Sequence, residues 1–348
     1  MRALSADRHP IIDSLRQRAS ALRKTVALPE TEDDRTFYAA AMALDAGICD
    51  VMLVGNPDHI MQRLSALSVA VNAVRIVDPT DDETVAQCAQ TYMEARPQEK
   101  LTEEQARQVA TDPLYCAACL LKMGEVDATV AGASHTTAEV LRPLLRIVGC
   151  APEVKTVSSC FIMTVPHSQV GDKGVLLFAD CGVVPQPTAQ QLADIAISTA
   201  HSARLYLQTE PKVAMLSFST KGSAQHPDVK KVVEATEIVR RKTSTLIIDG
   251  ELQADAALVP EVAQFKDPEG LLGGRANVLI FPDLDAGNIA YKLTQHLTGG
   301  HAYGPLVQGL ARAGMDLSRA ASAEDIVNVM AVAAVRAEAL AESNSTEA

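Results

Sequence analysis

Short apolar segments alternate with longer segments of helical periodicity along most of the chain. Apolar runs of about four to eight residues suit buried strands, whereas apolar residues that recur every three or four positions suit amphipathic helices. In the first half this pattern predicts strands over residues 25–28, 51–54, 73–77 and 128–130, and helices over residues 34–45, 82–95, 112–123 and 137–148. The alternation is typical of βα units stacked into a parallel sheet.

The pattern changes near residues 149–152. Residues 156–164 and 174–178 form two apolar runs joined by the polar stretch 166–173, which favours an antiparallel pair. The βα alternation then returns, with strands predicted over 213–216, 246–248 and 278–281 and helices over 187–207, 229–241, 286–296 and 323–341. We therefore predict a doubly wound α/β fold with two lobes, residues 1–148 plus 304–348 and residues 149–303, and a ligand cleft at the carboxyl ends of the strands.

The excess of acidic residues argues against polyanionic partners. The 348 residues include 31 basic and 43 acidic side chains, a formal net charge of −12. Nucleic acids and anionic membranes favour basic surfaces, so we expect neither as a partner, and an anionic small molecule would need local arginines and lysines. No apolar segment is long enough to span a bilayer, and residues 1–23 alternate charges with short apolar steps rather than forming a secretory leader. We therefore predict a cytoplasmic protein.

The seven cysteines are odd in number and widely spaced, which favours reduced thiols over a disulfide framework. Cys116 and Cys119 have the CxxC spacing of some metal and redox sites. They lie in a segment predicted to be a buried helix, and no second CxxC or histidine pair completes a zinc site. Packing in the core is therefore the favoured interpretation, and we expect no metal site.

A hydroxyl-rich loop, SFSTKGS, directly follows the predicted strand 213–216. Backbone N–H groups at a strand end, hydroxyl donors and one ammonium are the donors that a phosphoryl oxygen accepts, although Ser, Thr and Gly also make ordinary turns. The loop by itself fits both a phosphate site and an ordinary turn. If it binds phosphate, its candidate ligands are Ser217, Ser219, Thr220, Lys221, Gly222 and Ser223.

Two further strand-end loops carry acidic residues. Residues 281–288 resemble a calcium loop only superficially, because Gly287 falls one position early and Thr294 stands where a bidentate Glu is required. We expect Asp285 to cap a helix there, with Asn288 either a ligand donor or without a role in binding. The loop 249–255 is interpreted as structural.

Near the C-terminus, Ser318 and Arg319 place a hydroxyl beside a guanidinium, and Asp325 follows. The three groups offer a hydrogen-bond donor, an anion clamp and a general base. However, Ser322 and Asp325 stand three residues apart, as in a capping box, so Asp325 has a purely structural alternative.

Two arginines and a serine in the first half are additional candidates. Ser134 lies in a polar loop after the predicted strand 128–130, and Arg142 lies in the helix that follows. Arg96 lies in the loop after the predicted helix 82–95. A solvated surface position remains the alternative for each arginine.

Taken together, these loops resemble the phosphate acetyltransferase family. The resemblance is carried, in family order, by LPETEDDR, GEVDATVAGASHTTAEVLRP, FADCGVVPQPTAQQLADIA, VAMLSFSTKGSA, DGELQADAALVP, ANVLIFPDLDAGNIAYK, GPLVQGLA and DLSR. The length is similar to that of the short bacterial and ethanolamine-utilisation forms. The resemblance implies reversible transfer of an acetyl group between coenzyme A and inorganic phosphate. It also implies an αβα fold like that of isocitrate and isopropylmalate dehydrogenases, a homodimer, and coenzyme A as substrate rather than bound cofactor.

The resemblance also implies roles for individual residues. The thiol of coenzyme A would attack acetyl phosphate directly in a ternary complex, with Asp325 as its base, Ser318 donating to the carbonyl oxyanion and Arg319 binding phosphate. Arg142 and Arg96 would bind the anionic groups of the substrates. A thiol with a pKa of about 8.5 gains nucleophilicity from such a base, and the leaving phosphate needs fixed positive charge.

The chain departs from the family pattern in the loop around Ser318. Many members read PxNDLSRGC where this chain reads RAGMDLSRAA, so the usual Pro, Asn and Gly are absent. Ser168 replaces a Cys of some members, which indicates that no thiol nucleophile is needed there, and Thr31 replaces a common Gly. Two alternatives remain open: a phosphate butyryl- or propionyltransferase, and a non-catalytic sensor of acetyl-CoA or acyl phosphate. A metal-dependent dehydrogenase would need a carboxylate cluster and a nicotinamide site, and the sequence has neither that cluster nor GxGxxG.

Overall fold

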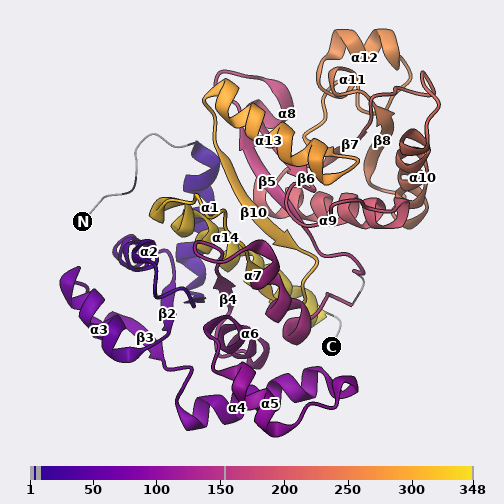
Figure 1. Cartoon of the computed structure of the whole chain (residues 1–348). Coiled ribbons are helices and arrows are strands. Elements are labelled where there is room, and N and C mark those ends of the chain that lie inside the picture. Colours follow the sequence, from indigo (N-terminus) through magenta and orange to yellow (C-terminus); the bar gives the residue numbers. More distant parts are fainter. Residues whose placement is uncertain (1–3, 5–8, 153, 347–348) are drawn as a thin grey trace. The chain divides into compact units, whose positions relative to one another are not determined.

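The chain divides into two compact units. The structure, a computed structural model, describes residues 4, 9–152 and 154–346 (Figure 1). Unit 1 comprises Met1–Ala151 and Leu310–Ala348, and unit 2 comprises Pro152–Gly309. The predicted boundary at residues 303 and 304 would have cut strand β10 (Ala302–Gln308), which belongs whole to unit 2 because it pairs with strand β5 (Ser158–Thr164).

Unit 1 is built on a parallel sheet. Its strand order is β11-β4-β1-β2-β3, and every neighbouring pair is parallel. Parallel strands are covered by helices on both faces, which explains why most of them read as continuous apolar runs. The strands are β1 (Thr25–Leu28), β2 (Asp50–Val54), β3 (Val74–Val77), β4 (Ala128–Val130) and β11 (Ala313–Met315).

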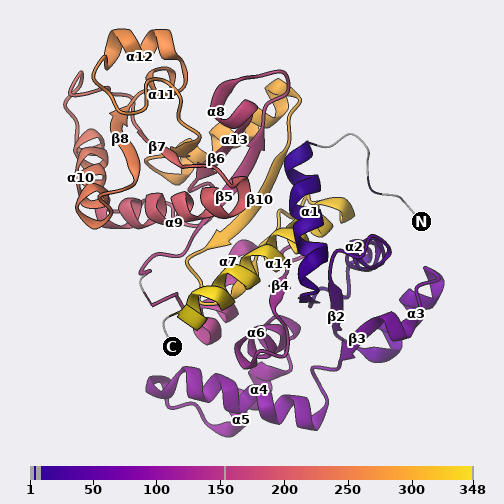
Figure 2. The same ribbon diagram turned by 180° about the vertical axis from the view of Figure 1, so that it is seen from behind.

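The helices of unit 1 begin at side-chain caps, such as Asp33, Asp81 and Asp112. The predicted helix 137–148 is a short α-helix followed by a π-helical turn, Leu144–Val148. The long C-terminal helix α14 packs against α1, α2 and β4 (Figure 2). The helices are α1 (Pro10–Leu22), α2 (Asp34–Asp45), α3 (Pro57–Ala66), α4 (Asp82–Ala95), α5 (Glu103–Ala110), α6 (Pro113–Met123), α7 (Thr137–Pro143) and α14 (Ala323–Thr346).

Unit 2 is built on a mixed sheet of order β10-β5-β6-β9-β7-β8. The pairs β10–β5 and β5–β6 are antiparallel, which confirms the predicted antiparallel pair, and the remaining pairs are parallel. The other strands are β6 (Val175–Ala179), β7 (Lys212–Leu216), β8 (Ile247–Leu252) and β9 (Val278–Ile280). The helices are α8 (Val170–Lys173), α9 (Ala189–Leu207), α10 (Pro227–Lys242), α11 (Ala254–Leu258), α12 (Pro260–Lys266) and α13 (Leu284–Thr298).

Six of the seven cysteines are buried. Cys116 and Cys119 on α6 are buried and face Cys88 on α4, with 3.9 Å between the Sγ atoms of Cys88 and Cys116. All seven cysteines are free thiols, and only Cys150 is exposed. The core interpretation of the CxxC spacing is therefore confirmed. No three His, Cys, Asp or Glu side chains among the described residues gather as a metal site. None of the helices in the described ranges is long and apolar enough to cross a membrane.

Candidate functional site

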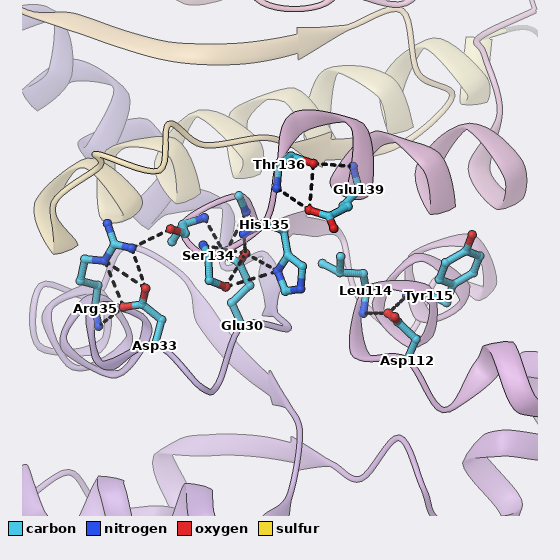
Figure 3. Close-up of polar contacts among 12 residues, drawn as sticks. Glu30, Asp33, Arg35, Asp112, Leu114, Tyr115, Ser134, His135, Thr136 and Glu139 are labelled. Atoms are coloured by element: carbon cyan, nitrogen blue, oxygen red, sulfur yellow. Dashed lines mark hydrogen bonds and ion pairs between the residues drawn. The ribbon is translucent and has the colours of Figure 1, made fainter.

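Three loops in unit 1 leave neighbouring strands at the same edge of the sheet. Strands β11, β4 and β1 are adjacent and parallel, so their carboxyl ends lie together. The loop after β1 carries Glu30 and leads into α2, whose second residue is Arg35. The loop after β4 carries residues 132–136, and the loop after β11 carries residues 316–322. Figure 3 shows the side chains of the first two loops in contact. The third contains Ser318 and Arg319, so the strand topology brings these candidates next to Ser134.

Glu30 fixes the loop after β4 in place. Its carboxylate is 4% exposed and accepts hydrogen bonds from the backbone N–H groups of residues 132–135. It also accepts from Ser134 Oγ at 3.0 Å and from His135 Nδ1 at 2.8 Å. Burial raises the pKa of Glu30, but the bonds from His135, Ser134 and Ala133 outweigh burial, and the pKa is lowered overall. Glu30 is therefore a carboxylate at neutral pH, and the hydroxyl of Ser134 donates to Glu30.

Arg35 joins all three loops through its guanidinium. Nη1 donates to the carbonyl oxygens of Arg319 at 2.8 Å and Ala321 at 2.7 Å, and Nη2 donates to Ala133 O at 2.6 Å. The same group forms a bidentate pair with Asp33, with Nε 3.0 Å from Oδ1 and Nη2 2.6 Å from Oδ2. The loop that carries Ser318 and Arg319 is thereby tied by its backbone to the loop after β4.

Asp316 forms a second contact between these loops. It is fully buried, and its Oδ2 accepts a hydrogen bond from Thr137 Oγ1 at 2.7 Å. Burial raises the pKa of Asp316 to about 6. Gly132 has φ +116°, and a Cβ there would lie 2.6 Å from Leu317 N, so the close approach of the two loops requires glycine.

The predicted catalytic residues have different surroundings. Ser318 is half-buried and Arg319 is exposed, and the hydroxyl of Ser318 accepts a bond from Ala320 N at 3.3 Å. Asp325 Oδ2 accepts from Ser322 N at 2.8 Å and from Ser322 Oγ at 2.7 Å, while Ser322 Oγ accepts from Asp325 N at 3.1 Å. These are the bonds of a capping box. Asp325 therefore caps α14 through Oδ2, and its Oδ1 takes no part in the capping box.

Two predicted arginines lie on the helical part of unit 1. Arg142 is exposed in the last turn of α7, and Arg96 caps the C-terminus of α4 with its Nε 3.8 Å from Glu99 Oε1. The sequence reasoning missed Arg146, whose Nη1 donates to Tyr92 OH at 3.0 Å. In the predicted helix 137–148 it would share a face with Arg142, four residues earlier, and that spacing was the signal available.

The SFSTKGS loop of unit 2 bonds mainly to carboxylates and amides of its own unit. Ser219 is fully buried and donates to Glu251 Oε1 at 2.9 Å, and Gly222 N donates to the same oxygen at 2.7 Å. Thr220 N donates to Ser223 Oγ at 3.0 Å, and Thr220 Oγ1 accepts from Gln253 N at 3.0 Å. Ser217 Oγ accepts from Ser219 N at 3.2 Å.

Lys221 forms ion pairs with two aspartates. Its Nζ pairs with Asp249 Oδ1 and lies 3.7 Å from Asp267 Oδ2, while Arg240 Nη2 is 2.7 Å from Asp249 Oδ1. Burial raises the pKa of Asp249, but its bond to Lys221 and the positive charge there lower the pKa overall. Asp249 was predicted to lie in a structural loop after a strand ending at residue 248, but β8 continues to Leu252, so Asp249 is a strand residue. A phosphate ligand would have to compete with Asp249 for the ammonium.

The start of α13 differs from the prediction. Asp283, rather than Asp285, is the N-cap, and its Oδ1 accepts from Ala286 N at 2.9 Å, so the predicted cap was wrong by two residues. The amide of Asn288 donates to Cys181 O at 3.0 Å. The structure thus brings Ser134, Ser318 and Arg319 together in unit 1, and residues 217–223 with Glu251 and Gln253 in unit 2.

Two α/β units of this topology define a known class of fold. The chain matches a putative 4-hydroxythreonine-4-phosphate dehydrogenase from Salmonella typhimurium with a TM-score of 0.50 over 90% of this chain and 99% of that one. At 14% identity this likeness shows the fold alone. It confirms the predicted α/β fold of the isocitrate dehydrogenase-like class.

Within that class the chain belongs to the phosphate acetyl/butaryl transferase family, whose model matches residues 10–334. It is 47% identical over 328 residues to the phosphate acetyltransferase of Thermoanaerobacterium thermosaccharolyticum, covering 94% of this chain and 99% of that one. Among solved structures, it matches a phosphotransacetylase from Streptococcus pyogenes with a TM-score of 0.90 and 38% identity, covering 95% and 98% of the two chains. It matches EutD phosphotransacetylase from Staphylococcus aureus with a TM-score of 0.85 and 37% identity, covering 94% and 98%. The predicted family and the predicted class of enzyme, an acyltransferase, are confirmed.

Proposed function

We propose that this chain catalyses reversible acetyl transfer between acetyl-CoA and inorganic phosphate, giving acetyl phosphate and coenzyme A. The observation that carries the proposal is the exposed Arg319 beside Ser318, on a loop whose backbone is fixed by Arg35. A free guanidinium on a fixed backbone suits a phosphoryl group whose charge changes during reaction. Membership of the family supports the same activity.

The proposed mechanism is direct attack of the coenzyme A thiolate on the acetyl carbonyl in a ternary complex. Asp325 accepts the thiol proton through the oxygen that the capping box leaves over, Ser318 donates to the carbonyl oxyanion, and Arg319 holds the phosphate. The C–S bond forms as the C–O bond to phosphate breaks. Coenzyme A is a substrate here and not a resident cofactor.

Binding of the substrates is assigned to the remaining candidates. Arg142 is proposed to bind a substrate anion and Arg96 to contact coenzyme A, because each supplies a positive charge on the helical part of unit 1. In unit 1, Ser134 is proposed to bind substrate. In unit 2, the residues proposed to bind substrate are Asn288 and those of the SFSTKGS loop, Ser217, Ser219, Thr220, Lys221, Gly222 and Ser223. For Lys221 this requires exchange of Asp249 for phosphate.

The first test measures thioester formation from coenzyme A with acetyl, propionyl and butyryl phosphate side by side, without added metal. We expect the fastest turnover with acetyl phosphate. A preference for butyryl phosphate would identify the chain as a phosphate butyryltransferase. The three acyl phosphates must be compared directly because one methylene changes the free energy of such discrimination by only about 1 to 3 kcal/mol. Binding of coenzyme A without turnover would indicate a sensor.

The second test separates catalysis by Asp325 from capping by Asp325. Asp325→Ala and Arg319→Ala are each expected to lower kcat by about 10² to 10⁴, the range for general bases and oxyanion donors. Ser322→Ala is the matched control, because it removes the cap hydroxyl and keeps the carboxylate; it should cost about 1 kcal/mol of stability and little turnover. If Asp325→Ala and Ser322→Ala have the same small effect on kcat, Asp325 is only a cap.

We also propose a cytoplasmic homodimer with no nucleic acid or membrane partner. The acidic net charge of −12 supports the absence of polyanionic partners. Ile289, Leu293 and Leu297 form an exposed apolar row along α13, the kind of surface that a subunit interface covers. A monomer mass in sedimentation equilibrium at micromolar concentration would contradict the dimer.

A further inference from the structure

A carboxylate–imidazole pair lies at the strand edge that carries Ser318 and Arg319. Glu30 Oε1 is 2.8 Å from His135 Nδ1, and the side chains are 3% and 41% exposed, respectively. Because the Glu30 carboxylate can only accept, Nδ1 carries the proton and donates it to Glu30 (Figure 3). The second ring nitrogen, Nε2, makes no hydrogen bond to any described residue of the chain. A buried carboxylate that fixes one nitrogen and leaves the other accessible is the arrangement of an acid–base histidine.

The pair is close to the loop that is proposed to bind phosphate. Gly132, three residues before His135, is packed so tightly on Leu317 that a Cβ would lie 2.6 Å from Leu317 N and 2.8 Å from Leu317 O. One nitrogen of Arg35 binds Ala133 O, and another binds Arg319 O. The backbone of residues 133–135 and that of residues 317–319 are thus neighbours, and both are fixed by buried or charged groups.

The balance of protons in the proposed reaction requires a second acid–base group. When coenzyme A attacks acetyl phosphate, the thiol loses a proton and the phosphate leaves as hydrogen phosphate, so its bridging oxygen must gain one. Asp325 accepts the thiol proton in the proposed mechanism, but it does not account for protonation of the leaving oxygen. A free carboxylic acid, with a pKa of about 4, is largely deprotonated at neutral pH, whereas an imidazole, with a pKa of about 6.5, holds a useful fraction of its acid form.

We propose that His135, oriented by Glu30, is the general acid that protonates the leaving phosphate oxygen through Nε2, and the base that deprotonates attacking phosphate in the reverse direction. This rests on the proposed acetyl transfer. In the forward step Asp325 gains the thiol proton, the C–S bond forms, the C–O bond breaks and Nε2 gives its proton to the released oxygen. Solvent then returns a proton to His135 and removes one from Asp325, so atoms and charge balance.

Charged groups from several elements face His135. Glu30 from the β1 loop contacts Nδ1, Glu139 on α7 interacts with the ring electrostatically, and Asp316 at the end of β11 lies next to Glu30. Arg35, from the start of α2, supplies the opposing positive charge and is itself paired with Asp33. Bound phosphate would add a further negative charge.

The test uses two substitutions of His135: one keeps a hydrogen-bond donor to Glu30, and the other leaves space for added imidazole. His135→Asn keeps an N–H near the position of Nδ1 that can still donate to Glu30, but it has no counterpart of Nε2. His135→Ala opens a space at a half-exposed position that added imidazole can enter. Both are expected to lower kcat for acetyl-CoA formation by about 10² or more, the usual contribution of a general acid. His296→Asn, on an exposed position of α13, is the matched control and should leave kcat unchanged.

Two readouts separate acid catalysis from a structural role. Imidazole should restore part of the kcat of His135→Ala and have no effect on the wild type or on His135→Asn. The fall in wild-type kcat as the pH rises through the range where imidazole titrates should be absent in His135→Asn. Turnover of His135→Asn within about twofold of wild type, or a reduced kcat with neither imidazole rescue nor a changed pH profile, would overturn the role of His135 alone. A wild type that makes no acetyl-CoA would overturn the proposed function as well.

Discussion

Asp316 links the stability of unit 1 to pH through a single buried carboxyl group. Its pKa is raised from 3.8 to about 6 by burial, so the folded state binds this proton more tightly than the unfolded chain does. The stabilisation is fully present below the unfolded pKa and is lost as the pH rises through about 6. A shift of about two pKa units corresponds to about 3 kcal/mol.

The prediction compares wild type with Asp316→Asn, which cannot ionise and can still accept the bond from Thr137. We expect the free energy of unfolding of the wild type, relative to the variant, to fall by about 2.4 kcal/mol between pH 4 and pH 7.5, because the unfolded carboxyl is already partly ionised at pH 4. Urea unfolding at several pH values measures this difference. Carboxylates with lowered pKa, such as Glu30, act in the opposite direction but are common to both proteins. Parallel pH profiles for the two proteins would contradict the prediction.

The sequence identified the residues that face outward at the site better than those that support them. Ser318 and Arg319 were singled out because a hydroxyl beside a guanidinium is a local signal. Glu30 and Arg35 were not singled out individually, because their partners are far away in sequence: Glu30 bonds residues more than 100 positions later, and Arg35 bonds Arg319, 284 positions later. The pairing of His135 with Glu30 was missed for the same reason.

At the scale of elements, Arg35 acts as a clamp on three strand-end loops. Arg35→Lys keeps one positive charge but loses the planar fork that reaches Ala133, Arg319 and Ala321 together. We expect kcat to fall by about tenfold or more, because a misplacement of about 1 Å in a catalytic loop is costly. The control is Arg63→Lys, where the guanidinium pairs with exposed Asp34. Equal activity of both variants would show that the clamp does not position Ser318 and Arg319.

The predicted elements are most accurate where burial on both faces dictates the sequence. Most strands of the two parallel regions were predicted because helices cover them and their residues are mostly apolar. The short parallel strand β11 (Ala313–Met315) was missed. Strand β10 was missed because Gly304 and Pro305 interrupt its apolar run. Helix α1 was missed because of its charged residues, yet Arg16 is buried and its Nε donates to Asn328 Oδ1 at 3.0 Å on α14. Its charge is paired with Glu324, whose Oε1 is 3.0 Å from Arg16 Nη2, and this partner 308 positions away is invisible in the local pattern.

At the scale of the whole molecule, the two units differ in continuity: one is a single segment of the chain and the other combines two segments. Unit 2 is one continuous segment, Pro152–Gly309, with its own six-stranded sheet and a core that includes Phe161, Met163 and Phe178. Unit 1 is discontinuous, because strand β11 and helix α14 come from the C-terminal segment. Helix α14 contributes buried side chains at Ile326, Val327, Met330 and Val332.

We therefore predict that the fragment 152–309 folds alone and that the fragment 1–151 does not. Burying a side chain such as Val327 or Met330 contributes about 1.5 to 3 kcal/mol. Four such residues together approach the whole stability of a domain, about 5 to 15 kcal/mol. Circular dichroism during urea unfolding should show a cooperative transition for 152–309 and none for 1–151. Co-expression of 1–151 with 310–348 is the matched control and should restore the transition, because it returns β11 and α14 to the sheet. A cooperative transition of 1–151 by itself would mean that the C-terminal helix is dispensable for the core of unit 1.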